Sequence, residues 1–254
     1  MIRICLIGSG NVAVALAREI IANDALSLVQ LKCRNTNSLP KDLSHVRLST
    51  QFSEVPNCDF VLIAVSDHAI REVSEKLPPS DAILAHTSGA SSIELLNKHH
   101  LRGVIYPLQT FSQYRHLNWQ EIPLLYEGSQ TSVNKKLEKL SSILSAVVCY
   151  AEEEQRLHLH LAAVLVNNFT NHLYVQAQKF CTSKQLNFDL LVPLIKETTH
   201  KITKLHSSHT QTGPASRGDH QTIERHQSIQ MTKELIDIYK LFTSQLIKQY
   251  NENL

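Results

Sequence analysis

The chain has 254 residues, of which 43% are hydrophobic, and a formal net charge of +2 at pH 7. This length and apolar content suffice for one large domain or two moderate ones, and the near-neutral charge offers no basic surplus for a nucleic-acid partner. No apolar run reaches the roughly 20 residues of a membrane span, so we expect no membrane partner. Five scattered cysteines without a C-x-x-C motif predict a reduced, cytoplasmic protein.

The first predicted element is a buried strand over residues 2–6, which turns on Gly8-Ser9-Gly10 into a helix over 12–21. Because this strand begins at residue 2, we expect no signal peptide before the fold. Strand, glycine turn and helix together form the G-x-G-x-x-A version of the dinucleotide fingerprint, with Ala13 in the last position.

Each fingerprint residue has a physical task. Gly8 permits the tight turn, Gly10 lets a diphosphate approach the backbone, and the small Ala13 lets the helix lie close to the strand. The N–H groups at the start of the helix attract phosphate. We therefore predict a nucleotide site at Gly8, Ser9, Gly10, Asn11 and Val12. The alternative is a structural turn between strand and helix.

A second strand, predicted over 26–33, is followed by Arg34, Asn35 and Thr36. NAD-specific folds place an acidic residue about 20 positions beyond the fingerprint to bind the ribose 2′-hydroxyl, and none stands here. These three residues instead offer a positive charge and polar groups suited to a 2′-phosphate. NADP(H) is therefore the preferred cofactor, and NAD(H) stays possible. The alternative makes Arg34 a solvated turn residue.

Residues 42–55 are predicted as a short helix or an irregular crossover, and 59–65 as the strongest strand of the sequence. Its continuous apolar run is typical of a parallel strand buried on both faces. Val65 and Ser66 at its carboxyl end are predicted to contact the cofactor. Asp67 is predicted to cap a helix over 69–77.

Further strands are predicted over 82–86, 103–106, 122–126 and 146–150, with helices over 93–99 and 133–144. This alternation predicts a Rossmann-like, mostly parallel α/β sheet. Thr87 and Ser88 end a strand at the same edge as the fingerprint, so we expect them to contact nicotinamide. Gln109 and Thr110 follow the next strand and are candidates for substrate binding; the alternative for all four is an ordinary turn.

From residue 152 on the pattern is helical, with helices over 155–181 and 187–205 (interrupted by Pro193) and one or two last helices over 221–250. We predict a dinucleotide-binding domain over 1–151 and an all-helical domain for substrate binding and dimerisation over 152–254. The first of these helices is apolar nearly all round, which is typical of a helix buried inside a domain or across a subunit interface. Its apolar residues include Leu157, Leu161, Leu165 and Phe169.

Polar residues interrupt this apolar helix. At about 100° per residue, His160, Asn167 and Asn171 share one strip, and Asn168 lies beside it. Such groups must be hydrogen-bonded by neighbouring helices or by a polar ligand, because leaving them unpaired costs a few kcal/mol. We list Asn167 and Asn171 as substrate-binding candidates.

The polar loop over 207–219 contains a second group of substrate-binding candidates, Gln211, Thr212, Gly213 and Arg217. The Gly-Pro step after Thr212 fixes a turn, and Arg217 can pair with a substrate carboxylate. The alternative is a structural ion pair of Arg217 with Asp219 or Glu224. Asp219 is the predicted cap of the following helix.

These motifs resemble the β-hydroxyacid dehydrogenase and pyrroline-5-carboxylate reductase superfamily. Within it, the chain is similar to an uncharacterised group of NADP oxidoreductases with a Rossmann-like domain and a helical domain of unknown function. The resemblance covers almost the whole chain and implies a homodimer through the helical domain, with an active site between the sheet's carboxyl edge and that domain. The matching stretches lie at residues 8–13, 64–67, 86–89, 106–111, 166–172 and 211–215.

The dehydrogenases of this superfamily carry a K-x-x-N-N run whose lysine is the catalytic acid. The matching residues here are Val164, Asn167 and Asn168, so the asparagines are present and the lysine is a valine. His160, one turn earlier, is a candidate acid, and we predict catalytic roles for His160 and Asn168. Alternatively His160 only orients the substrate, or an already protonated iminium substrate needs no side-chain acid.

We therefore predict an NADP-dependent oxidoreductase that transfers hydride between nicotinamide and a small keto, hydroxy or imino acid. The alternative is a non-catalytic NADP(H)-binding or sensing protein, which Val164 favours. No metal is expected, because His158 and His160 point apart on a helix and no H-x-x-x-H motif has a carboxylate nearby.

Overall fold

The computed structural model describes residues 1–113, 115–204 and 211–251. Residues 205 and 207–210, at the end of one predicted helix and in the predicted polar loop, lie outside this range. The chain divides into two compact units, Met1–Asn167 and a second that begins at Asn168. The predicted domain boundary after residue 151 remains a prediction.

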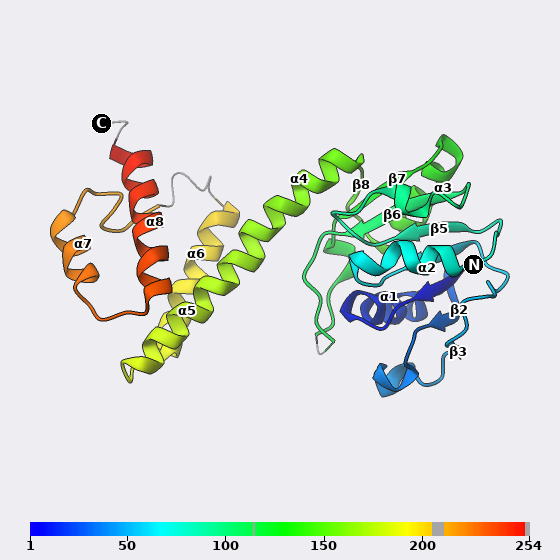
Figure 1. Ribbon diagram of the computed structural model, residues 1–254, viewed down its shortest axis with the longest axis horizontal. Coiled ribbons are helices and arrows are strands. Elements are labelled where there is room, and N and C mark those ends of the chain that lie inside the picture. The colour runs from blue at the N-terminus through cyan, green and yellow to red at the C-terminus, as the bar shows by residue number, and fades with distance from the viewer. Residues whose placement is uncertain (114, 205–210, 252–254) are drawn as a thin grey trace. The chain divides into compact units, whose positions relative to one another are not determined.

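The first unit is built on one eight-stranded sheet (Figure 1). Its elements in chain order are β1 (Ile2–Ile7), α1 (Asn11–Ala22), β2 (Leu26–Lys32), η1 (Thr36–Ser38), η2 (Lys41–Leu43), β3 (Leu48–Ser49), β4 (Phe60–Ile63), η3 (Asp67–Ala69), α2 (Ile70–Lys76), β5 (Ile83–His86), η4 (Ile93–Leu96), β6 (Arg102–Pro107), η5 (Trp119–Glu121), β7 (Leu124–Gly128), α3 (Thr131–Leu144), β8 (Val148–Tyr150) and α4 (Glu153–Ala163).

The strand order is β3-β2-β1-β4-β5-β6-β7-β8, and every neighbouring pair is parallel except β6 and β7. The first six strands thus follow the Rossmann order, and the predicted mostly parallel sheet is confirmed. The chain order reverses between β1 and β4, and in open α/β sheets ligands bind outside the carboxyl ends of the strands at such a point.

Both faces of the sheet are covered, because neighbouring strand residues point to opposite sides. In β1, Ile4 and Leu6 pack into one core cluster with residues of α1 and α3. Cys5 and Ile7 pack into a second cluster with residues of α2 and η4. The predicted burial of Cys5 in its strand is therefore confirmed, and the doubly covered sheet holds the strand ends in fixed positions.

Three local predictions were wrong. The region predicted as a short helix or crossover over 42–55 contains a strand, β3, which pairs with β2. The helix predicted over 93–99 is a single 3₁₀ turn, η4, begun by the side chain of Ser92, which accepts from the Glu94 N–H. Asp67 is not a cap: it is the first residue of η3, and that turn has no side-chain cap.

The long predicted helix consists of α4, a π-helical segment (Val164–Phe169) and α5 (Thr170–Ser183). A π segment has i→i+5 hydrogen bonds, so the angle between successive residues differs from that of an α-helix. The strip predicted for His160, Asn167 and Asn171 assumed a regular α-helix and therefore does not carry across this segment. Single-turn π segments occur frequently at functional sites.

This helix, predicted to be buried inside a domain or across a subunit interface, has several exposed apolar residues in the single chain. Leu157, Leu161 and Leu165 are 45%, 57% and 53% exposed in the single chain. The sequence shows that these residues are apolar but not whether their cover comes from the same chain. Burial across a subunit interface remains a prediction.

The second unit continues with α5, η7 (Phe188–Leu191), α6 (Val192–Lys204), α7 (His220–Gln227) and α8 (Lys233–Asn251). Pro193 lies in the first turn of α6, where its missing N–H costs no helical hydrogen bond. Asp219 caps α7 as predicted, since its carboxylate accepts from the Thr222 N–H at 3.0 Å. Among the described residues, no helix has the length and apolar character needed to cross a membrane.

Candidate functional site

The turn after β1 is built around Gly8 and Gly10. Gly8 has φ of +141°, and a Cβ atom there would lie 2.1 Å from the carbonyl oxygen of Ala64 and 3.1 Å from the Cβ of Ala13. Only glycine allows the first turn to pass this close to β4. Around Gly10, by contrast, a Cβ would meet nothing within 4 Å. The space in front of Gly10 is therefore open.

Helix α1 begins at this open space without a side-chain cap. Its N-cap residue is Gly10, no side chain caps the helix, and its first turn carries no acidic residue. The side-chain amide of Asn11 is directed elsewhere and donates to the Phe111 carbonyl at 3.0 Å. The first backbone N–H groups of α1 thus remain available to an anion. Open space, free N–H groups and no competing carboxylate fit a diphosphate.

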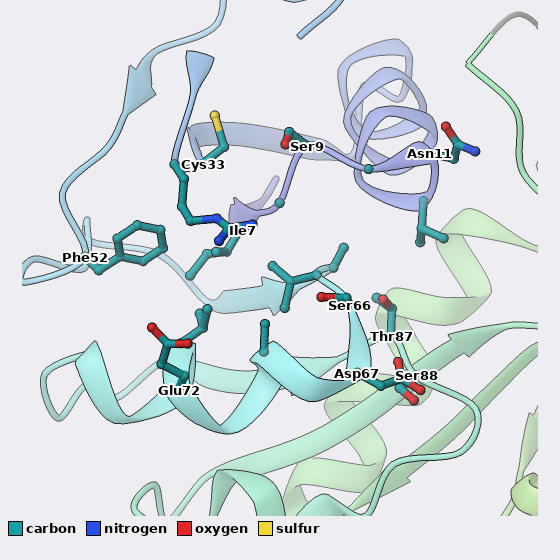
Figure 2. Close-up of a pocket in the computed structure, with 18 of the residues that line it drawn as sticks. Ile7, Ser9, Asn11, Cys33, Phe52, Ser66, Asp67, Glu72, Thr87 and Ser88 are labelled. Carbon is teal, nitrogen blue, oxygen red and sulfur yellow. The ribbon is translucent and has the colours of Figure 1, made fainter. Parts of the chain in front are cut away.

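A cavity of about 390 Å³ extends from this turn across the carboxyl ends of β1, β2, β4 and β5. Figure 2 shows Asp67, Thr87 and Ser88 at one end of the cavity and Phe52 and Glu72 at the other. The cavity is lined by Ile7, Gly8, Ser9, Gly10, Asn11, Val12, Cys33, Arg34, Phe52, Ala64, Val65, Ser66, Asp67, Ala69, Glu72, Val73, Lys76, Thr87 and Ser88.

The structure brings together most of the predicted cofactor-binding residues in this one cavity. Asn35 and Thr36 are the exceptions. The Asn35 side chain accepts from the Asn37 N–H at 2.9 Å and caps η1, the turn that contains Thr36. The polar run after β2 therefore contributes Arg34 to the cavity wall and uses Asn35 to fold the next turn.

Arg34 is exposed at the cavity wall. Among the described residues it has no carboxylate within ion-pair distance. Lys76, the other cation on this wall, pairs with Glu72 at 2.5 Å. That hydrogen bond, together with the charges of Lys76 and Arg34, lowers the pKa of Glu72. Arg34 is thus the cation that is free to meet an anionic ligand.

Beyond the end of the cavity where Thr87 and Ser88 lie, Tyr106 of β6 contacts His160 of α4. The Tyr106 hydroxyl lies 3.0 Å from His160 Nδ1, and the two rings meet edge to face with centroids 5.8 Å apart. Gly89 leaves room for the pair, because a Cβ there would lie 2.6 Å from the Tyr106 ring and 3.0 Å from His160 Nδ1. Burial and the charge of Asp67 raise the pKa of Tyr106.

A buried polar network holds the loop that contains Gly89. His86 is fully buried; its Nδ1 accepts from the Ser88 N–H at 3.2 Å, so Nε2 carries the proton and donates to the Ser92 carbonyl at 3.3 Å. Arg156, also fully buried, donates to the Ser91 carbonyl at 2.8 Å and to the Glu127 carboxylate. These contacts fix the backbone on both sides of Gly89.

The burial of His86 makes stability depend on pH. Burial, followed by the charge of Arg156, lowers the pKa of His86 from 6.5 to about 4. Between these values the unfolded chain binds the extra proton, so the free energy of unfolding rises with pH. The contribution of His86 is complete above about pH 6.5 and is lost as the pH falls to about 4, with an upper limit of roughly 3 kcal/mol.

Urea titrations at pH 5 and pH 7 check this expectation through the fluorescence of Trp119, which is buried in the first unit and is the chain's single tryptophan. His86→Asn is expected to show a smaller change in unfolding free energy between the two pH values than the native protein. Equal changes in both proteins would contradict it. If the variant does not fold, the titration of His86 itself by NMR gives the same answer.

The remaining predicted residues lie outside the cavity wall. Gln109 and Thr110 are exposed, and the Gln109 side chain accepts from the Thr110 N–H at 2.8 Å. Asn167 lies in the π segment at the end of the first unit. The other candidates, Asn168, Asn171, Gln211, Thr212, Gly213 and Arg217, belong to the second unit, and their roles remain predictions.

Within the described residues, the structure bears on the ion pair considered for Arg217 and on metal binding. No ion pair joins Arg217 to Asp219 or Glu224, although the Arg217 charge contributes to lowering the pKa of Asp219 after the hydrogen bonds from Thr222. No group of three His, Cys, Asp or Glu side chains in the described ranges is arranged to hold a metal ion.

Sequence reasoning missed Phe52, Val73 and Tyr106 as site residues. The sequence did contain a signal for Val73. It follows Ala69, another residue of the cavity wall, by four positions, which places the two on the same side of a helical segment. Phe52 lies in an irregular segment and carries no such signal. Tyr106 is the last residue of the strand predicted over 103–106, and only the packing of α4 gives it a histidine partner.

Two family models match the chain. Residues 3–87 match the family described as "NADP oxidoreductase coenzyme F420-dependent", and residues 122–246 match "Domain of unknown function (DUF2520)". No curated protein matches. The first match contains the fingerprint turn and Thr87, and thus most of the cavity described above.

Solved structures agree with this assignment. A Bacteroides fragilis protein named "putative NADP oxidoreductase" is 32% identical, with 97% of this chain and 98% of that chain covered and a TM-score of 0.87. An imine reductase from Myxococcus stipitatus in complex with NADP+ is 15% identical (98% and 93% covered, TM-score 0.62). A reductive aminase from Aspergillus terreus in complex with NADPH and ethyl-5-oxohexanoate is 14% identical (98% and 94% covered, TM-score 0.68).

The last two structures share the fold, whereas the first shares sequence along nearly its entire length. The cavity at the fingerprint turn, the absence of a cap on α1 and the family match over 3–87 all concern the same residues. The chain therefore belongs to the family of NADP oxidoreductases in which a Rossmann-like nucleotide domain is followed by a DUF2520 domain.

Proposed function

We propose that the protein is an NADP(H)-dependent reductase that transfers hydride between nicotinamide and a small keto, hydroxy or imino acid. One observation carries the proposal: a single cavity joins the open Gly10 turn and the uncapped start of α1 to the unpaired cation Arg34. The bound cofactor supplies the hydride, and the chain supplies binding and orientation.

Each part of the cavity suits one part of the cofactor. The backbone at Gly10 and the start of α1 bind the diphosphate. Phe52 and Val73 provide apolar surface for adenine, and Arg34 binds the 2′-phosphate. Thr87, at the opposite end in Figure 2, lies where the nicotinamide is expected.

A C=N group is the favoured target within the proposed substrate class. Val164 cannot supply the proton that the superfamily's lysine supplies, and an iminium substrate brings its own. The shared fold with an imine reductase and a reductive aminase supports the same choice. We keep Asn168 as a catalytic candidate. The substrate-contact candidates are Gln109, Thr110, Asn167, Asn171, Gln211, Thr212, Gly213 and Arg217.

We also propose a homodimer formed through the helical region and working in the cytoplasm. The exposed leucines of α4 and the π segment are the apolar surface that such an interface would cover, and the five cysteines are all free thiols. Light scattering on the purified protein tests the first point, and a monomer at micromolar concentration would overturn it.

The function is tested by following the absorbance of NADPH with a panel of small keto acids, cyclic imines and keto acid–amine mixtures. Turnover of any member supports the reductase. NADPH binding without turnover of any member would instead favour a non-catalytic NADP(H)-binding or sensing protein, the function that Val164 suggests.

Replacing Arg34 with alanine is expected to weaken NADPH binding by about 10- to 100-fold, because a charge-assisted contact to the 2′-phosphate contributes roughly 1.5–3 kcal/mol. Binding of NADH, which lacks this phosphate, is expected to change by less than about twofold. Arg71→Ala is the matched control, since Arg71 is exposed on α2 and does not line the cavity. Fluorescence titration with both cofactors measures the effect; an equal loss for both would contradict it.

A further inference from the structure

The reduction of a neutral carbonyl or imine requires a proton as well as a hydride, and the residue at the superfamily's lysine position, Val164, cannot donate one. Another group near the cavity must therefore supply it. Ser88 is engaged as an acceptor, since its hydroxyl oxygen accepts from the N–H groups of Ala90 and Ser91. His86 is buried and both of its nitrogens are used. Next to Ser88, across Gly89, Tyr106 and His160 form a contacting pair of titratable side chains.

The Tyr106 side chain is positioned by contacts from two elements, and its hydroxyl lies within reach of the charge of a third. Its oxygen lies 3.0 Å from His160 Nδ1 on α4, and its ring packs over Gly89 in the loop after β5. Gly89 is the neighbour of Ser88, which lines the cavity. Asp67, also on the cavity wall, is close enough for its charge to act on the Tyr106 hydroxyl. The hydroxyl is therefore at the end of the cavity where the nicotinamide is expected.

Other features of the molecule favour a fixed position for this pair. The loop that carries Gly89 is held by His86 and by the buried guanidinium of Arg156. Arg156 belongs to α4, the helix that also carries His160, and lies one turn before it. The same helix thus fixes the loop on one side of the Tyr106 ring and the imidazole on the other.

We propose that the Tyr106 hydroxyl is the proton donor to the substrate heteroatom and that His160 is a positioning residue that holds Tyr106 and returns its proton. This inference rests on the proposed reductase function. It reassigns the predicted acid role from His160 to the residue that His160 contacts.

The proposed step balances as follows. The substrate carbon accepts the hydride, the π electrons of its C=O or C=N bond move to the heteroatom, and that atom forms a bond to the Tyr106 proton. The Tyr106 oxygen recovers a proton from Nδ1 of His160, and Nε2 of His160 takes one from water. Proton exchange with water then returns the imidazole to its Nδ1–H form before the next turnover. The net change is one hydride from the reduced cofactor and one proton from solvent added across the double bond.

The imidazole is suited to this relay because His160 is half-buried and contacts Tyr106 through one of its two ring nitrogens. The charged and titratable groups that act on the Tyr106 hydroxyl are His160 from α4 and Asp67 from η3. Burial, followed by the negative charge of Asp67, raises the pKa of Tyr106, so both favour the protonated phenol at neutral pH. The donor form is therefore the form present in the resting protein.

Tyr106→Phe, which removes only the hydroxyl, is expected to lower kcat by about 100-fold or more on a neutral substrate, the usual contribution of a general acid. The dissociation constant of NADPH is expected to stay within about threefold, because Tyr106 lies just beyond the wall of the cavity proposed to hold the cofactor. Tyr126→Phe is the matched control: its hydroxyl, on β7, interacts with Glu138 instead. Trp119 fluorescence verifies that each variant is folded.

His160 is tested by a pair of substitutions. His160→Asn keeps a polar group near the Nδ1 position, whereas His160→Phe removes it. We expect Asn to retain more kcat than Phe, and Tyr106→Phe combined with His160→Phe to be no slower than Tyr106→Phe by itself, since residues that act as one unit are not additive.

A measurement without cofactor or substrate tests the contact directly. In protein labelled with ¹³C at tyrosine Cζ, the Tyr106 signal is identified by its loss in Tyr106→Phe. It is expected to shift in His160→Phe and to return toward the native position in His160→Asn. An unmoved signal would overturn the positioning role of His160.

The outcomes separate the two levels of the proposal. If the native protein reduces a panel member and Tyr106→Phe reduces it equally fast, the donor role is overturned and the reductase function stands. A loss in His160→Phe greater than in Tyr106→Phe would also overturn it, in favour of direct donation by His160. If the native protein binds NADPH and reduces nothing, the function itself fails and the donor role fails with it.

Discussion

Replacing Gly8 with alanine is expected to destabilise the first unit by about 3 kcal/mol or more and to abolish NADPH binding. The new Cβ would lie 2.1 Å from the Ala64 carbonyl oxygen, which is backbone and cannot move aside without displacing β4. The φ of +141° adds strain, because L side chains rarely adopt it. Urea unfolding followed by Trp119 fluorescence measures the stability, and fluorescence titration measures the binding.

Gly10→Ala is the matched control for this prediction. Its Cβ would meet nothing within 4 Å, and its φ of −76° suits alanine, so we expect the free energy of unfolding to change by less than about 1 kcal/mol. NADPH binding is nevertheless expected to weaken at least tenfold, because the methyl group enters the space meant for the diphosphate. If Gly10→Ala bound NADPH normally, the diphosphate would have to lie elsewhere.

Replacing Arg156 with methionine is expected to lower the free energy of unfolding by about 3–5 kcal/mol, the usual cost of removing one partner of a buried ion pair. The change leaves the Glu127 carboxylate, whose side chain is 14% exposed, without its cation and the Ser91 carbonyl without its donor. It also removes the charge that contributes to the low pKa of His86, which is expected to rise. Urea titration and NMR of His86 measure the two effects.

A double variant separates the lost pair from the lost packing. Arg156→Met with Glu127→Leu is expected to recover a large part of the stability, because replacing both partners by apolar groups is often neutral. A double variant less stable than Arg156→Met would mean that Glu127 has another role. An Arg156→Met protein as stable as the native one would contradict the network that holds the Gly89 loop.

Much of the nucleotide site could be predicted because its signals are local. The G-x-G-x-x-A run states where a turn must be tight and where a helix must begin, and both depend on residues within six positions of each other. The apolar run of β4 likewise indicates burial on both faces of the sheet from neighbouring residues of the sequence. Arg34 follows directly, since a residue at the end of the strand next to β1 must lie near the same edge.

The contact between Tyr106 and His160 could not be predicted in this way. Tyr106 and His160 are 54 positions apart, and no spacing rule connects the end of β6 with α4. The helical wheel that selected His160, Asn167 and Asn171 assumed an α-helix, and the π segment over Val164–Phe169 breaks that assumption. Leu157, predicted to be buried inside a domain or across a subunit interface, is exposed in the single chain. Hydrophobicity shows that a side chain favours burial but not which chain provides it.

The sequence by itself determined the class of fold, the position of the glycine turn and the placing of Arg34 at the end of the neighbouring strand, because each depends on conformational preferences within a short stretch. Only the tertiary structure decided that Gly8 lies against the backbone of Ala64, that Arg156 is a buried partner of Glu127, and that Tyr106 meets His160 over Gly89. These contacts join residues distant in the chain, and they arise from the packing of helices and loops on the sheet.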